Sequence, residues 1–326
     1  MAVYTHLASH EIEALLSHYD IGELTSALGI AEGVENSNYL LVTEHNGVEK
    51  KFIFTIFEAR MNEEDLPFYL GLMQHMAEQS IPSPLPIAAK DGSIIQRTPD
   101  GKPCVLVSFL TGRSVRQVQN HHTRELGETL AKMHVAAKTY SGKRPNALSL
   151  AGWRKLFEKT AERADECMPG LRNMIEGELH YLMGAWPGPA RLPSGVVHAD
   201  LFPDNVFFRD GKLSGVIDFY FACNDSWMYD LTIVLNAWCF ENDGSFNVTK
   251  ARYLMAGYQS VRRLTDEERK YLPILARGAA LRFLLTRLHD WMYTVEGAVV
   301  TVKDPREYVF KLQFHQSIKG FAAYGL

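Results

Sequence analysis

The sequence has little of what marks several large classes of protein. Its 326 residues include only four cysteines, and none of them form a C-x-x-C pair, so neither a zinc ribbon nor a disulfide framework is indicated. The formal net charge of −4 gives no support to a broad basic surface for nucleic acid. The first residues, MAVYTHLASHEIEALL, lack the pattern of a secretory signal, and the apolar run over residues 231–240 is too short to span a bilayer. We therefore expect a cytoplasmic protein with reduced thiols that binds neither nucleic acid nor membrane.

Common phosphate-binding motifs are absent as well. The chain contains no G-x-x-x-x-G-K-[ST] loop and no G-x-G-x-x-G fingerprint, which argues against a P-loop or a dinucleotide-binding fold. No H-E-x-x-H pair occurs among the twelve histidines, so a helix-borne zinc site is not indicated. Any nucleotide chemistry must therefore rest on a different arrangement of residues.

Apolar periodicity predicts a sheet-rich N-terminal part and a helical remainder. Two β-rich runs meet at Asn46-Gly47, which is the strongest short hairpin signal. After Gly112 the apolar residues recur at helical spacing. The expected domains are residues 1–108 and 109–326. The expected elements are a helix Ser9–Tyr19 with Ser9 as N-cap, strands Asn38–Glu44 and Lys50–Phe57, a helix Glu63–Gln79, a strand Cys104–Phe109, helices Thr123–Tyr140, Trp153–Ala164 and Leu171–Leu182, strands Asn205–Phe208 and Leu213–Phe219, and a late helix opened by the capping box Thr265–Glu268.

The segment VVHADLFPDNVFF, residues 196–208, places polar residues between two apolar runs. A tight turn is the simplest explanation, since Pro-Asp-Asn is turn chemistry. However, His198, Asp200 and Asn205 form an H-x-D-x-x-x-x-N pattern, and Asp218 follows Asn205 by thirteen residues after an apolar strand. This combination resembles the catalytic loop and the metal-binding aspartate of protein kinases. We therefore expect an α+β, bilobal protein-kinase-like fold, with a small antiparallel-sheet N-lobe and a larger, mainly helical C-lobe.

Each of these residues has a chemical reason to be present. Asp200 could accept the proton of a hydroxyl group that attacks a γ-phosphoryl group. Asn205 and Asp218 offer the hard oxygen ligands that Mg²⁺ prefers. His198 is interpreted as a residue that braces the loop, and Asp230 as one that hydrogen-bonds to the loop backbone from the helix beneath.

The N-terminal part offers a weaker pattern. In GVENSN, residues 33–38, the amides of Asn36 and Asn38 and the hydroxyl of Ser37 could donate to phosphate oxygens, although an ordinary loop is the alternative. Thr55 stands where a kinase strand carries its phosphate-binding lysine. Lys51 and Arg60 are candidates to replace that lysine, which would otherwise pair with Glu63 or Glu64.

Several segments together resemble the homoserine kinases of the aminoglycoside-phosphotransferase and choline-kinase superfamily. They are GVENSNYLL, IPSPLP, LVSFLTGRS, LGETLAKMH, HADLFPDNVFF and VIDFYFACNDSWMYDL. The resemblance runs along nearly the whole chain, and the homoserine kinase branch also tends to lack the strand lysine. It implies that ATP and L-homoserine, with Mg²⁺, give O-phospho-L-homoserine, a step toward threonine.

The resemblance also implies roles for particular residues. Asp200 would be the base, and Asn205 and Asp218 the Mg²⁺ ligands. The hinge that meets adenine would be Ser108, Phe109 and Leu110. Because homoserine is a zwitterion, its pocket should offer a cation and an acid. The candidates are Arg282 and Arg287 for the carboxylate, and the acids are Asp204 and either Asp225 or Asp290.

Two alternatives stay open at this point. A kinase of the same fold could act on choline, an aminoglycoside or a sugar amine, which would favour an aromatic cage or an acidic pocket. An inactive nucleotide-binding module is the other alternative, and Thr55 is the reason to consider it. The intact trio of Asp200, Asn205 and Asp218 argues against it. No feature of the sequence specifies an oligomeric state.

Overall fold

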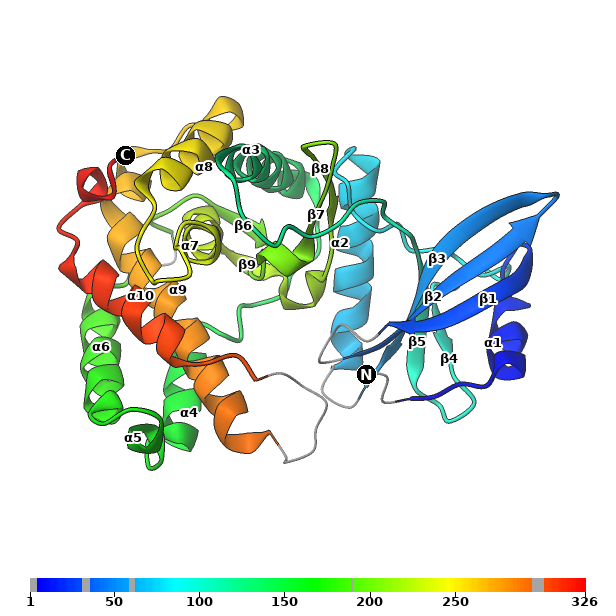
Figure 1. Cartoon of the computed structure of the whole chain (residues 1–326), viewed down its shortest axis with the longest axis horizontal. Coiled ribbons are helices and arrows are strands. Elements are labelled where there is room, and N and C mark those ends of the chain that lie inside the picture. The colour runs from blue at the N-terminus through cyan, green and yellow to red at the C-terminus, as the bar shows by residue number, and fades with distance from the viewer. Residues whose placement is uncertain (1–4, 31–35, 59–61, 189, 295–301) are drawn as a thin grey trace. The chain divides into compact units, whose positions relative to one another are not determined.

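The structure is a computed structural model, and it describes residues 5–30, 36–58, 62–188, 190–294 and 302–326 (Figure 1). The chain divides into two compact units, residues 1–111 and 112–326. The boundary predicted from the sequence, 108/109, lies close to this division. The first unit is built around an antiparallel sheet and the second is mainly helical, so the predicted α+β class is confirmed.

The first unit contains a five-stranded antiparallel sheet with the strand order β1-β2-β3-β5-β4. Asn46 and Gly47 turn the β2–β3 hairpin with positive φ angles of 53° and 78°, as their sequence predicts. In chain order, the elements of this unit are α1 (Ser9–Leu16), β1 (Glu23–Ile30), β2 (Asn36–His45), β3 (Val48–Phe57), a 3₁₀ turn (Glu63–Asp65), α2 (Leu66–Glu78), β4 (Ile95–Arg97) and β5 (Pro103–Ser108).

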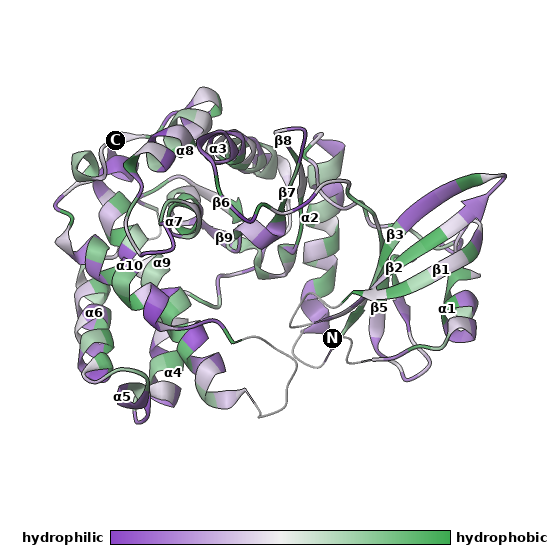
Figure 2. Ribbon diagram, in the orientation of Figure 1, coloured by the Kyte–Doolittle hydropathy of each residue, from purple (hydrophilic) through white to green (hydrophobic). Residues whose placement is uncertain are grey.

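Helix α1 packs its apolar side against one face of this sheet. Ile12 and Leu15 of α1 belong to one buried cluster with Tyr39, Phe54 and Leu106 of β2, β3 and β5. Figure 2 shows hydrophobic residues along β2 and β3, and hydrophilic residues at the N-terminal end of β3, next to the hairpin turn. The cluster fixes the sheet against the N-terminal segment.

The start of α1 corrects one prediction. Ser9 is the first helical residue, and the N-cap is Ala8, which has no side-chain acceptor for the first turn. The backbone N–H of Ala8 instead donates to the Glu11 carboxylate at 2.7 Å. An acidic side chain in the first turn thus satisfies the helix end without a polar cap.

The second unit surrounds the buried helix α7. The residues of α7 from Trp227 to Asn236 are all buried, so this mainly apolar helix is covered on every side (Figure 1). The elements of this unit are α3 (Asn120–Ala136), α4 (Leu150–Thr160), α5 (Ala164–Cys167), α6 (Leu171–Ala185), β6 (Ser194–Val197), a 3₁₀ turn (Pro203–Asn205), β7 (Val206–Arg209), β8 (Lys212–Val216), a 3₁₀ turn (Phe219–Phe221), β9 (Cys223–Ser226), α7 (Trp227–Trp238), α8 (Val248–Val261), α9 (Asp266–Tyr293), α10 (Arg306–Ser317) and a 3₁₀ turn (Phe321–Tyr324). In the described part of the chain, no helix is both long and apolar enough to cross a membrane.

Two short antiparallel ladders frame the polar segment found in the sequence. Strand β6 leads into the segment and pairs with β9. Strand β7 leads out of it and pairs with β8. The predicted strand Leu213–Phe219 ends earlier, at Val216, because Asp218 takes a left-handed conformation with φ 64°. Strands β1, β4, β6 and β9 were not predicted: β1 is mostly exposed, and the others are only three or four residues long.

Helices α3 and α8 cross closely at two glycines. A Cβ atom on Gly127 would lie 2.1 Å from the Leu254 carbonyl oxygen, and one on Gly257 would lie 2.1 Å from the Arg124 carbonyl oxygen. Each helix therefore needs glycine where it meets the backbone of the other.

We expect Gly127→Ala to lower the free energy of unfolding by about 1–3 kcal/mol, because the added methyl group forces two packed helices apart. The matched control is Gly177→Ala in α6, where a Cβ atom meets nothing within 4 Å. That change should raise stability by up to about 1 kcal/mol through helix propensity. Urea denaturation measures both, and a Gly127→Ala protein as stable as the wild type would contradict the close crossing.

Candidate active site

The loop after β6 is held by the two nitrogen atoms of a buried histidine. His198 Nε2 donates to the Ile217 carbonyl oxygen at 3.0 Å, and His198 Nδ1 accepts from the Asp200 N–H at 3.3 Å. These roles require the neutral Nε2–H tautomer. Burial lowers the pKa of His198 to about 4, so the ring stays neutral near pH 7. His198 therefore ties the loop to the segment that carries Asp218.

The carboxylate of Asp230 lies directly beneath this loop. Its Oδ2 accepts from the His198 N–H at 3.0 Å, and its Oδ1 accepts from the Ala199 N–H at 2.8 Å. His134 Nε2 donates to Oδ2 as well, at 2.9 Å. Burial alone would raise the pKa of Asp230, but the hydrogen bond from His134 and the other contacts lower it overall. A fully buried, ionised carboxylate thus receives three donors, two of them from the loop backbone.

Ala199 bends the chain between these contacts. Its φ of 64° is unusual for a residue other than glycine, and such conformations persist only where neighbouring groups hold them. Its N–H is bonded to Asp230, and its carbonyl oxygen accepts from Arg282 Nη1 at 2.6 Å. Both sides of the strained peptide are therefore fixed by buried charged groups.

The three predicted catalytic and metal-binding residues come from neighbouring positions in this frame. Asn205 Nδ2 donates to the backbone oxygen of Asp200 at 2.8 Å and to its Oδ2 at 3.1 Å. The Ile217 N–H donates to the Asn205 carbonyl oxygen at 3.0 Å, which sets Asn205 beside the residue preceding Asp218. All three side chains are partly exposed. Burial raises the pKa of Asp200 to about 6, against the opposing influence of Arg282.

The residues present fit a divalent cation. Among the described residues no group of three His, Cys, Asp or Glu side chains gathers as a metal site. Asn205 turns its amide nitrogen toward Asp200, which leaves its Oδ1 on the opposite side of the amide. One amide and one carboxylate oxygen suit Mg²⁺, which usually keeps few protein ligands and completes its shell with phosphate oxygens and water.

A second layer of polar residues supports Asp230. His134 Nδ1 accepts from the Tyr258 hydroxyl at 2.8 Å, and Arg262 Nε donates to the same hydroxyl oxygen at 2.9 Å. Arg262 also pairs with the buried Glu268, which forms the predicted capping box with Thr265 at the start of α9. The loop is therefore connected through hydrogen bonds to α3, α8 and α9.

The predicted phosphate-binding residues of β2 are engaged within the first unit. The Ser37 hydroxyl is buried, donates to Glu58 Oε1 at 2.7 Å and accepts from the Thr5 N–H at 3.0 Å. Asn38 Oδ1 accepts from the Thr55 hydroxyl at 2.7 Å. The Asn36 residue is 7% exposed, and its Oδ1 has no hydrogen-bond partner among the described residues. Of Asn36, Ser37 and Asn38, the residues of this stretch that the structure describes, only Asn36 has a buried side-chain oxygen without a partner.

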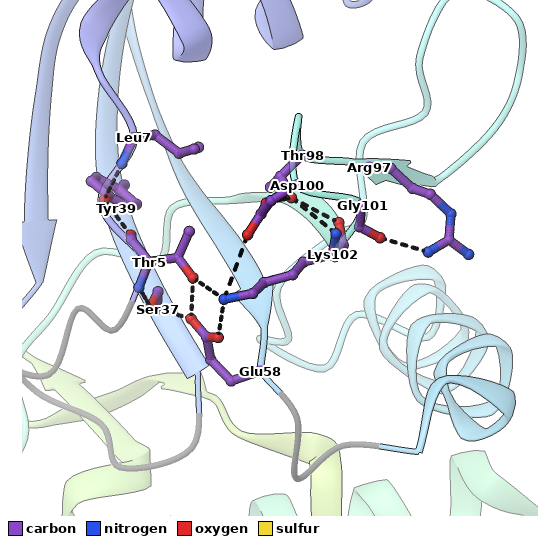
Figure 3. A network of polar contacts seen from close by, with 10 residues as sticks. All are labelled: Thr5, Leu7, Ser37, Tyr39, Glu58, Arg97, Thr98, Asp100, Gly101 and Lys102. Atoms are coloured by element: carbon purple, nitrogen blue, oxygen red, sulfur yellow. Dashed lines mark hydrogen bonds and ion pairs between the residues drawn. The ribbon is translucent and has the colours of Figure 1, made fainter.

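Sequence reasoning missed an ion pair at the same end of the sheet (Figure 3). Lys102 Nζ lies 2.7 Å from Glu58 Oε2 and 2.5 Å from the Thr5 hydroxyl oxygen. Burial would raise the pKa of Glu58, but the hydrogen bonds from Lys102, Thr5 and Ser37 lower it overall.

Lys51 is exposed on β3, and Arg60 and Gly33 lie outside the described residues. The Ser108 hydroxyl accepts from the Leu85 N–H at 2.9 Å, while Phe109 and Leu110 are half-buried.

A cavity of about 350 Å³ opens beside the loop within the second unit. It is lined by Ser114, Val115, Phe202, Pro203, Asp204, Ala237, Arg287, Lys303, Glu307 and Lys311. Arg287 and Asp204, both predicted to meet the substrate, are therefore at this cavity. The loop residues and α9 and α10 form its walls.

The other two predicted substrate residues do not line this cavity. Arg282 holds the Ala199 carbonyl oxygen, and Asp225 accepts from Asn146 Nδ2 at 2.6 Å. Both side chains therefore make contacts within the second unit, and Arg282 Nε has no hydrogen-bond partner among the described residues. Sequence reasoning missed Glu307 and Lys311, because an acid and a lysine four residues apart on a helix resemble an ordinary surface pair.

An antiparallel five-stranded sheet, a helical unit and an H-x-D-x-x-x-x-N loop followed by an aspartate define the class of kinase-like phosphotransferases. Residues 26–264 match the phosphotransferase enzyme family, and the chain belongs to that family. The predicted kinase-like fold is confirmed.

The similar proteins agree with this membership. A homoserine kinase of Rhizobium etli (strain CIAT 652) is 55% identical over 326 residues, which cover 100% of this chain and 99% of that protein. Among solved structures, an amicoumacin kinase in complex with AMP-PNP, Ca²⁺ and Ami has a TM-score of 0.70 at 15% identity, covering 98% of this chain and 94% of the other. A microcompartment-associated aminopropanol kinase has a TM-score of 0.65 at 16% identity, covering 95% and 97%. The two structures establish the fold, and the curated relative matches this chain end to end.

We expect Asp230→Asn to lower the free energy of unfolding by about 1–3 kcal/mol, because the amide group replaces one acceptor with a donor and leaves buried N–H groups unpaired. Turnover should fall as well, since the loop loses its fixed backbone. The control is Asp210→Asn, the same change at a side chain that is 92% exposed, which should alter stability by no more than about 0.5 kcal/mol. Equal stability of the two variants would show that the loop does not depend on Asp230.

Proposed function

We propose that this chain is a homoserine kinase of the cytoplasm, which transfers the γ-phosphoryl group of ATP to the side-chain hydroxyl of L-homoserine and releases ADP and O-phospho-L-homoserine. The observation that carries the proposal is the 55% identity to a homoserine kinase over the full length of both chains. The loop of His198, Asp200 and Asn205 supports the same chemistry, because its side chains suit alcohol deprotonation and metal binding.

In this proposal Asp200 takes the proton from the homoserine hydroxyl. The hydroxyl oxygen then bonds to the γ-phosphorus while the bond to the β,γ-bridging oxygen breaks, so that the electron pair leaves with ADP. A base with its pKa raised toward the working pH is efficient, because it is still ionised yet binds a proton well. The raised pKa of Asp200 and its hydrogen bond from Asn205 support this role.

Asn205 and Asp218 would hold Mg²⁺, which offsets the negative charge of the triphosphate. The Asn205 carbonyl oxygen accepts a hydrogen bond from the Ile217 N–H, and this contact keeps Asn205 close to the residue that precedes Asp218. Asp218 has the left-handed conformation that is common where a site constrains its backbone. The ion would therefore be held by a rigid hairpin rather than by a flexible loop.

The first unit would bind the nucleotide. In the proposal, the backbone of Ser108, Phe109 and Leu110 meets adenine, and Asn36 and Asn38 at the start of β2 meet phosphate. The Ser37 hydroxyl is committed to Glu58, so we assign it the task of holding β2 rather than of binding phosphate. Lys102 and Glu58 fix the same end of the sheet.

We expect the purified protein to release ADP from ATP with L-homoserine, in a reaction that requires Mg²⁺ and stops with EDTA. The comparison uses a panel of alcohols, namely homoserine, choline, an aminoglycoside and a sugar amine. Activity with choline but not with homoserine would reverse the proposed substrate. Absence of ADP release with every alcohol would support an inactive nucleotide-binding module instead.

We expect Asp200→Asn to reduce turnover by roughly 10²-fold or more while leaving folding and ATP binding largely intact. The asparagine keeps the shape of the side chain and its contact with Asn205, but it cannot accept the substrate proton. Steady-state kinetics measure turnover, and a fluorescent ATP analogue measures binding. Near wild-type turnover in this variant would remove Asp200 from the mechanism.

A further inference from the structure

The cavity beside the loop has a cationic wall that one carboxylate does not neutralise. Arg287 of α9 and Lys311 of α10 are 8% and 5% exposed. Arg287 Nη1 lies 2.5 Å from Glu307 Oε2, and Lys311 Nζ lies 2.6 Å from Glu307 Oε1. In the described part of the chain, neither cation forms an ion pair with a second acid. The three residues therefore carry a formal surplus of one positive charge.

The surroundings offset this surplus only in part. The Tyr308 ring lies 4.5 Å from the Arg287 guanidinium carbon and 4.6 Å from Lys311 Nζ, and the Phe240 ring lies 5.4 Å from the same Nζ. The Asp304 carbonyl oxygen accepts from Arg287 Nη1 at 3.3 Å. Rings and a carbonyl dipole stabilise a cation less than a carboxylate does.

The pKa of Lys311 agrees with a cation that is only partly compensated. Burial lowers its pKa, and the neighbouring Glu307 does not fully reverse that effect. A buried cation with too little compensation is stabilised by an anionic ligand that enters the cavity. Asp204 and Lys303, the other charged residues of the cavity wall, pair with each other at 3.2 Å, so they do not supply the missing negative charge.

We propose that Arg287 and Lys311 bind the α-carboxylate of the amino-acid substrate, and that this contact separates homoserine from amino alcohols that lack a carboxylate. The assignment rests on the proposed function and adds Lys311 to its specificity-determining residues. Arg287 donates its hydrogen bonds to described residues through Nη1, so its Nε and Nη2 groups can meet a ligand oxygen in the forked geometry that suits carboxylates.

Glu307 has a positioning role in this arrangement. Each of its carboxylate oxygens is already taken by one of the two cations, so it holds them side by side and is not available for the substrate ammonium. Asp204 lies in the loop between Asp200 and Asn205 and lines the cavity. Its pair with Lys303 uses Oδ2, so we assign its Oδ1 to the ammonium group. The substrate would then extend from the two cations toward Asp200 with its hydroxyl end.

The test compares two substrates that differ only in the carboxylate, L-homoserine and 3-aminopropan-1-ol. Lys311→Met removes the charge and keeps a long apolar side chain against Tyr308, so the Arg287–Glu307 pair is left neutral. We expect kcat/KM for homoserine to fall roughly 10- to 100-fold, as for a lost charge-assisted contact, while kcat/KM for 3-aminopropan-1-ol changes less than about threefold. Lys311→Arg should restore much of the preference for homoserine. The matched control is Lys159→Met at an exposed position, which should change neither value.

A binding measurement keeps the test independent of slow turnover. Calorimetry with L-2-aminobutyrate, which has the carboxylate and ammonium of homoserine but no hydroxyl, should show a loss of affinity of similar size in Lys311→Met and none in Lys159→Met. The carboxylate assignment is overturned if Lys311→Met changes kcat/KM by the same factor for both substrates, or changes neither value, and binds L-2-aminobutyrate as tightly as the wild type does. The proposed function stands in that case. If the wild type itself does not phosphorylate homoserine, the proposed function fails, and the assignment fails with it.

Discussion

The candidate site depends first on one buried carboxylate. Helix α7 is buried on every side and places Asp230 beneath the backbone of His198 and Ala199. The left-handed turn at Ala199 takes these N–H groups out of any strand ladder, and buried backbone donors need a partner. Because Asp230 receives three donors, its charge is tolerated, and the loop has its shape before any ligand binds. Asn205 and Asp218 owe their placement to this shape.

The first unit uses a similar arrangement at one end of its sheet (Figure 3). Glu58 joins segments that are distant in sequence, since it accepts from Thr5, Ser37 and Lys102. Tyr39 continues the connection by donating its hydroxyl to the Thr5 carbonyl oxygen at 2.7 Å. A half-buried carboxylate with several donors fixes geometry better than an isolated surface ion pair, which gains little in water. In each unit a carboxylate that accepts several hydrogen bonds therefore holds together segments that are distant in sequence.

The sequence allowed prediction of features that arise from local chemistry. The Asn46-Gly47 turn and the capping box at Thr265 need only a few adjacent residues, and the spacing of Asp200, Asn205 and Asp218 is set by one loop and one hairpin. Strand β1 escaped prediction because most of its residues are exposed and show no alternation. Arg282 Nη1 donates to the Ala199 carbonyl oxygen, a contact that depends on the packing of α9 and that the sequence did not indicate. Glu307 and Lys311 could not be singled out from the sequence, because only the fold shows that they line a cavity.

The charge of that cavity also bears on which alcohols would fit the proposed substrate site. Choline and aminoglycosides are cations, so pockets for them favour aromatic rings or several acids. Here two buried cations share Glu307, and the aromatic side chain of Tyr308 is already covered by them. A ligand cation about 4 Å from an uncompensated charge would lose on the order of 4 kcal/mol at an effective dielectric constant of 20. Selectivity for an amino acid would then come as much from repulsion of purely cationic alcohols as from attraction of a carboxylate.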